Sequence, residues 1–160
     1  MKTRTGILSK LMYVSILVLF GVFALNSCKK KSTTDNRPYT LTGDAAGSQV
    51  VPPVTGNGTG SFNGTYNPAT RAMTYTTNWS GLSGGASSGG FYNGASGSSG
   101  TAIGDPWTLP VDSTGTGTFS GTMTLTDEQA SQLTSGNWYY SLGTAANPSG
   151  EIRGQITATR

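Results

Sequence analysis

The stretch GNWYYSLGTAANPSGEIRGQI, Gly136 to Ile156, indicates the fold more directly than any other part of the chain. Trp138, Tyr140 and Leu142 recur with a period of two, which is the pattern of a strand with one buried face. A turn follows, and Ile152 lies in a second apolar segment. The stretch therefore predicts two strands joined by a turn.

The same alternation recurs earlier in the chain. It is seen from Phe62 to Tyr66, from Met73 to Trp79 and from Phe119 to Leu125, and Tyr39 to Thr42 is a first short strand. Many short strands with abundant Thr and Gly predict an all-β fold, an immunoglobulin-like antiparallel sandwich or barrel. Residues 38–160 are enough for one domain and too few for two of normal size.

One short helix is expected between the last strands. Thr126 and Gln129 have the spacing of a capping box, in which each side chain accepts from the backbone N–H of the other residue. Gly136 is suited to end this helix.

The N-terminus has the composition of an export signal. Lys2, Arg4 and Lys10 precede the apolar run from Leu11 to Leu25, which is too short for a comfortable membrane span. Cys28, the single cysteine, follows directly and resembles the lipobox cysteine of bacterial lipoproteins. We therefore expect residues 1–27 to be a lipoprotein signal peptide. Cys28 is then the lipidation site and anchors the protein to a membrane of the bacterial envelope, with the outer membrane favoured.

The charge is concentrated in the segment after this cysteine. Without residues 1–27 the chain has seven basic and seven acidic residues. Residues 28–37 have a local excess of three positive charges and form a basic tether, which could rest on anionic lipid or serve as a solvated spacer. Because the domain itself is not basic, nucleic acid is not an expected partner.

The Gly/Ser-rich segment 80–104 breaks the strand pattern. It offers few apolar atoms to offset the entropy of ordering, so we expect a mobile loop. Phe91 and Tyr92 either pin this loop to the core or form a contact surface, and Trp107 after it is the third candidate for ligand binding, with core packing as the alternative. Asp112-Ser113-Thr114 resembles a short O-glycosylation acceptor pattern of some Gram-negative lipoproteins.

Several motifs together resemble the CHRD domain, which occurs in chordin and in many secreted or anchored microbial proteins. They are the segment around Pro52 and Pro53, Met73 to Leu82, and Pro148 to Ile156 with its Gly-Glu-Ile-Arg-Gly-Gln signature. The resemblance covers about Tyr39 to Thr157. It implies an immunoglobulin-like β-barrel with no established enzymatic activity.

The signature is interpreted as structural. Glu151 and Arg153 project from the same face of an extended strand, where they can pair with each other or with a turn. Gly150 and Gly154 leave room for close backbone approach or unusual dihedral angles. Many family members carry histidines that this chain lacks, so neither a metal site nor a cofactor is expected.

Binding is a stronger functional class than catalysis. A serine or threonine nucleophile needs a base, and the chain has no histidine. The sequence does not exclude a hydrolase that uses a pair of carboxylates, nor calcium binding through Asp105 or Asp112. We therefore expect a lipid-anchored, non-catalytic binding or structural module with a glycan, matrix or protein partner, and we do not expect an enzyme.

Overall fold

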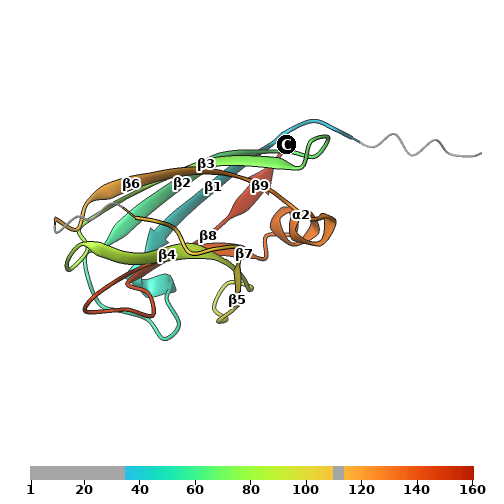
Figure 1. Cartoon of the computed structure of the whole chain (residues 1–160). Coiled ribbons are helices and arrows are strands. Elements are labelled where there is room, and N and C mark those ends of the chain that lie inside the picture. The colour runs from blue at the N-terminus through green and yellow to red at the C-terminus, as the bar shows by residue number, and fades with distance from the viewer. Residues whose placement is uncertain (1–34, 110–113) are drawn as a thin grey trace, which may run out of the picture. The chain divides into compact units, whose positions relative to one another are not determined.

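The computed structural model describes residues 35–109 and 114–160 (Figure 1). The predicted signal peptide 1–27, the lipidation site Cys28 and most of the tether 28–37 lie outside these residues. Contacts group Asn36–Arg160 into one unit, which contains every core residue named below. Because this unit has a complete core of its own, it can fold without the preceding segment.

The described residues form nine strands and two short helices. They are β1 (Tyr39–Ala46), the 3-10 helix η1 (Gly47–Gln49), β2 (Thr59–Asn67), β3 (Ala72–Ser80), β4 (Ala86–Asn93), β5 (Thr101–Ile103), β6 (Gly117–Thr124), α2 (Asp127–Thr134), β7 (Trp138–Thr144), β8 (Ile152–Gln155) and β9 (Thr157–Thr159). The strands predicted from alternation are all present, which confirms the mostly β class.

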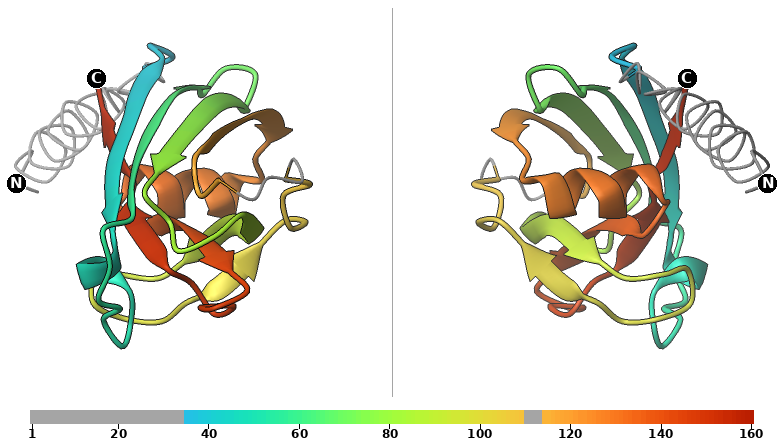
Figure 2. Two further views of the ribbon diagram at one scale, coloured as in Figure 1. Left: turned by 90° about the vertical axis from the view of Figure 1, so that its left-hand side faces the viewer. Right: turned by 90° about the vertical axis from the view of Figure 1, so that its right-hand side faces the viewer.

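The described strands form one antiparallel sheet of nine strands, with the order β5-β4-β7-β8-β1-β2-β3-β6 and with β9 paired to β1. The sheet curls into a half-barrel, so that β4 and β7 face β2 and β3 across the core (Figures 1 and 2). Of the expected immunoglobulin-like antiparallel sandwich or barrel, the antiparallel β class is confirmed, and the described strands form one curled sheet in which an immunoglobulin-like sandwich is not seen. The sheet is continuous because β8 pairs with β7 on one side and, through Arg153 and Ala46, with β1 on the other.

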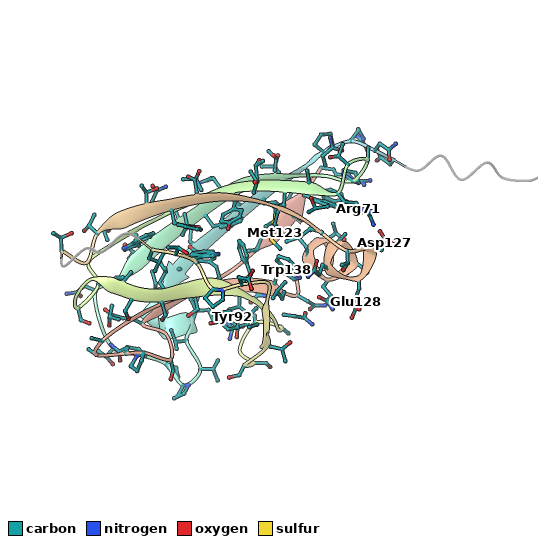
Figure 3. The ribbon with its side chains drawn as sticks, in the orientation of Figure 1. Arg71, Tyr92, Met123, Asp127, Glu128 and Trp138 are labelled. Atoms are coloured by element: carbon teal, nitrogen blue, oxygen red, sulfur yellow. The ribbon has the colours of Figure 1, made fainter. Side chains whose placement is uncertain are left out.

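The core fills the inside of the curl. Its buried residues come from nearly every strand: Leu41, Phe62, Tyr66, Met73, Trp79, Phe91, Ile103, Trp107, Leu125, Leu133, Trp138, Tyr140, Leu142, Ile152 and Ile156. Trp79 and Trp138, expected in the core, are both buried. Figure 3 shows Trp138 between the two sides of the sheet.

The helix α2 begins as predicted. The Thr126 hydroxyl accepts from the Gln129 backbone N–H at 3.2 Å, and the Gln129 side chain accepts from the Thr126 N–H at 2.9 Å. The chain leaves the helix through Gly136, whose φ of 74° is left-handed. The helix lies across one end of the curled sheet, where Leu133 is fully buried (Figure 2).

The prediction of a mobile loop over residues 80–104 was wrong. Strands β4 and β5 lie within this segment, and β4 pairs with β7 from Ala86 to Asn93. Packing requires the glycine at position 89, because a Cβ on Gly89 would lie 2.8 Å from the Trp107 ring and 2.9 Å from a Leu142 methyl. The large side chains of Trp107 and Leu142 thus supply the apolar contact that the Gly/Ser-rich strand lacks.

Candidate functional site

Glu151 lies just before β8 and is only 3% exposed. Its carboxylate accepts hydrogen bonds from the Ser83 backbone N–H and from the Ser83 hydroxyl, both at 2.6 Å. The Thr144 hydroxyl donates at 2.6 Å, and the Asn147 amide donates at 3.4 Å. The carboxylate therefore connects the end of β7 and the following turn to the loop after β3.

These contacts set the ionisation of the group. Burial by itself raises the pKa of the Glu151 carboxyl, but the hydrogen bonds from Ser83, Thr144 and Asn147 outweigh it and hold the pKa below its usual value. Glu151 is thus a charged structural acceptor at neutral pH. A general acid needs the opposite shift, toward a raised pKa.

Arg153, in β8, is also 3% exposed, and it does not pair with Glu151. Its guanidinium donates to the Ser98 carbonyl at 2.7 Å and to the Ala95 carbonyl at 2.8 Å, and it lies over the Tyr139 ring at 3.5 Å. Burial lowers its pKa, and the group remains a cation because its ordinary value is so high. Of the two predicted arrangements, pairing with each other or with a turn, the structure has the second.

Gln155 extends this network from the same strand. Its amide donates to the Gly94 carbonyl at 3.0 Å and to the Gly136 carbonyl at 2.8 Å. Arg153 and Gln155 together hold the loop between β4 and β5. Sequence reasoning missed Gln155, although it follows Arg153 at the two-residue spacing that puts both on one face of a strand.

The two signature glycines have separate physical reasons. Gly150 has a φ of 130°, a conformation that side-chain-bearing residues rarely adopt. A Cβ on Gly154 would lie 2.5 Å from the Tyr140 ring and 2.9 Å from the Asp44 carbonyl. Gly150 allows an unusual backbone dihedral angle, and Gly154 allows close packing against the backbone and a ring. The signature as a whole connects loops to the sheet.

Most of the described fold and the whole of this signature lie within one family match. The family model of the CHRD domain matches residues 41–156. The chain belongs to the CHRD-domain family. No curated protein and no solved structure matches it. The match covers β2 to β8 and all of β1 except Tyr39 and Thr40, so the CHRD domain here is essentially the curled sheet itself.

The three aromatic ligand candidates occupy different environments in this CHRD domain. Trp107, expected at the surface or in the core, is buried at 8% exposure among Tyr75, Phe91 and Phe119. Phe91 is buried at 3%. Tyr92 lies on the outer side of β4, stacked on Tyr139 at 5.1 Å between ring centroids (Figure 3). The two most buried rings therefore form core and not an exposed stacking surface.

Two further sequence motifs have exposed residues, the paired prolines and the 112–114 pattern. Pro52 and Pro53 are exposed in the segment between η1 and β2, outside any strand, where their missing backbone N–H groups interrupt no sheet hydrogen bonds. The Val51–Pro52 peptide bond is cis. Of the glycosylation pattern, Asp112 and Ser113 lie outside the described residues and Thr114 is exposed.

The acidic residues of the described part do not gather into a site. Among residues 35–109 and 114–160, no group of three or more His, Cys, Asp or Glu could hold a metal ion. Asp127 pairs with Arg71 at 3.2 Å, and Glu128 accepts from Gln132 at 3.1 Å (Figure 3). The same part of the chain has no helix with the length and hydropathy needed to cross a membrane.

Proposed function

We propose that this CHRD-domain protein is a lipid-anchored module of the bacterial cell envelope that binds or holds a partner and does not catalyse a reaction. Signal residues 1–27 direct export, Cys28 carries the lipid, and the basic tether to residue 37 separates the domain from the membrane surface. The outer membrane is the favoured location, on either its periplasmic or its outer face.

One observation supports the non-catalytic role above all. Glu151 and Arg153 are the charged residues of the family signature, and both are buried with their hydrogen bonds directed to backbone, hydroxyl and amide groups of nearby loops. A glycoside hydrolase needs two carboxylates about 5 to 10 Å apart around an open site. Glu151 is only 3% exposed and therefore does not line an open site, which makes the carboxylate-dependent hydrolase the weaker alternative.

The anchoring is tested on the protein isolated from bacterial membranes. We expect the mature protein to begin at Cys28 with the added mass of acyl chains, and we expect Cys28→Ser to release it into the soluble fraction. An intact mass with no acyl addition would remove the lipid anchor from the proposal. The same mass spectrum reads out any glycan on the 112–114 pattern.

The binding role is tested on the Asn36–Arg160 unit. Its melting temperature is measured with polysaccharides, envelope extracts and divalent metals, because a ligand of the native state stabilises by RT ln(1 + [L]/Kd), about 2.7 kcal/mol at a hundredfold excess over Kd. A shift with a glycan or protein fraction is expected. Turnover of any substrate that is abolished by a single carboxylate substitution, such as Glu151→Gln, would overturn the proposal.

A further inference from the structure

The outer face of one side of the sheet has an unusual composition. On β9, β1, β2, β3 and β6 the side chains that point away from the core are almost all short and uncharged: Thr157, Thr159, Thr40, Thr42, Ser61, Asn63, Thr65, Thr74, Thr76, Asn78, Thr118, Ser120 and Thr122. Asp44 is the only charged residue at an outward position of these five strands. We call this surface the hydroxyl face.

The strand register aligns these side chains into two rows across the sheet. Cross-strand partners place Thr159, Thr40, Thr65, Thr74 and Thr122 in the first row, and Thr157, Thr42, Asn63, Thr76 and Ser120 in the second. Neighbours within a row lie about 4.8 Å apart, and the rows are about 6.7 Å apart, because the side chains on one face repeat every second residue.

A shallow trough, widely open to solvent, runs between the rows where they cross β2, β3 and β6. Asn63, Thr76 and Ser120 form one wall, and Thr65, Thr74 and Thr122 form the other. The floor is the backbone of Gly64, Tyr75 and Gly121, which occupy inward positions.

The walls are preorganised by hydrogen bonds between neighbouring strands. Thr65 and Thr74 share a hydroxyl hydrogen bond of 2.9 Å, and Thr76 and Ser120 share one of 2.8 Å. Each hydroxyl has one proton and two lone pairs, so a pair that shares one bond still has an O–H donor and several acceptors for a ligand. The threonine methyl groups lie beside them and supply apolar contact.

The chemistry of the face selects among polymeric partners. Nucleic acid requires Lys and Arg, and protein interfaces are enriched in aromatic residues and Arg, but neither row contains any of these. An uncharged polymer that carries both hydroxyls and C–H surfaces matches the donors, acceptors and methyl groups that the trough provides. Ice is not the expected partner, because a crystalline ice plane needs a flat array of side chains, whereas this sheet curls.

We propose that the trough on the hydroxyl face binds an uncharged polysaccharide chain that lies across β2, β3 and β6. This inference rests on the proposed binding role and names the partner for it. The site differs from the aromatic candidates of the sequence, since its contacts come from threonine, serine and asparagine side chains.

The test measures retention of the Asn36–Arg160 unit on insoluble cellulose, chitin and β-1,3-glucan, with alginate beads as a charged comparison. Thr122→Lys and Thr118→Lys are a matched pair, because both residues are exposed and outward on the edge strand β6 but only Thr122 lines the trough. Lysine is well tolerated on edge strands, so both variants should fold.

We expect retention on at least one uncharged polysaccharide, reduced at least about fivefold by Thr122→Lys and unchanged by Thr118→Lys. Thr74→Val keeps the shape and the strand propensity while removing one hydroxyl, and it should reduce retention by a similar factor. Equal melting temperatures of the variants show that the loss is local.

Three results would overturn the inference. They are no retention on any uncharged polysaccharide, retention on alginate alone, and arrest of ice-crystal growth by a protein that no polysaccharide retains. If the protein is acylated but no polysaccharide retains it, the proposed lipid anchor stands and the polysaccharide inference is refuted. If a polysaccharide retains the protein but the protein has no acyl chains, the polysaccharide inference stands and the proposed lipid anchor is refuted.

Discussion

Glu151 and Arg153 lie two residues apart and are equally buried, yet each stabilises a different loop. Glu151 is held by hydroxyl and N–H donors, and Arg153 is held by carbonyl acceptors and the Tyr139 ring. Each charge thus has local polar partners, which a buried ion requires. A buried polar group without a partner should instead reduce the stability of the fold.

Thr77 and Thr144 form that contrast among the buried threonines. Thr77 is fully buried and its hydroxyl has no partner, whereas the Thr144 hydroxyl donates to Glu151. We expect Thr77→Val to raise the free energy of unfolding by about 1 kcal/mol and Thr144→Val to lower it by about 1.5 to 3 kcal/mol. Urea unfolding of both variants measures this, and changes of the same sign would contradict it.

The lowered pKa of Glu151 gives the protein an acid dependence of known sign. A carboxyl whose folded pKa lies below its unfolded value, about 4.3, stabilises the native state above that pH, and this stabilisation is lost as the pH falls toward the folded pKa. Glu151→Gln should therefore be destabilising at neutral pH, and its difference from wild type should narrow on acidification. Urea unfolding from about pH 7 to about pH 3 tests this, and a constant difference would refute it.

At the level of elements, β4 is a strand whose sequence does not look like one. The alternating aromatic and polar residues of β2, β3 and β7 predict strands because each one carries its own apolar face. In β4, the partner residues Trp107 and Leu142 fill the space above Gly89 instead. Local sequence cannot indicate contacts of this kind, so the loop prediction failed here.

The adjacent glycines of β4 offer a direct test of this account. A Cβ on Gly89 would meet Trp107 and Leu142 at under 3 Å, and a Cβ on Gly90 would meet nothing within 4 Å. We expect Gly89→Ala to destabilise by about 1 to 3 kcal/mol and Gly90→Ala to be neutral or stabilising by about 0.4 to 1 kcal/mol. Thermal unfolding of the pair decides it, and equal melting temperatures would argue against the packing role of Gly89.

As with the fold, the sequence predicted only part of the candidate site. The signature drew attention to Glu151, Arg153 and both glycines from sequence alone. Ser83, the main partner of Glu151, lies 68 positions away and is one serine among many. The hydroxyl face was missed because outward threonines become a surface only when the strand register aligns them.

At the level of the whole molecule, Trp107 joins the two sides of the curled sheet. Its ring stacks on Tyr75 and Phe119 at 5.8 and 5.0 Å between centroids, and on the other side it meets the edge of Phe91 at 5.1 Å. A ligand-binding tryptophan can be replaced without loss of the fold, but this one connects β3 and β6 to β4.

Trp107→Ala should therefore lower the free energy of unfolding by about 3 to 5 kcal/mol, as for other buried aromatic residues. Tyr92→Ala is the control, because Tyr92 is only partly buried and lies outside the core, and a markedly smaller loss is expected there. Hydrogen exchange of β4 and β6 should rise together in Trp107→Ala. Similar losses in the two variants would remove the bridging role of Trp107.

The pairing of β9 with β1 brings the two ends of the domain together. Thr159 is the cross-strand partner of Thr40, and the Arg160 guanidinium lies 4.1 Å from the centre of the Tyr39 ring. A short linker could join these ends, and new ends could be opened at Gly56, where nothing lies within 4 Å of an added Cβ. The domain is thus suited to circular permutation and to insertion as a cassette into a loop of another protein. A reporter fused after Arg160 would lie near Tyr39 at the start of β1, whereas one inserted at Gly56 would lie near the other end of β1, where Ala46 pairs with Thr59.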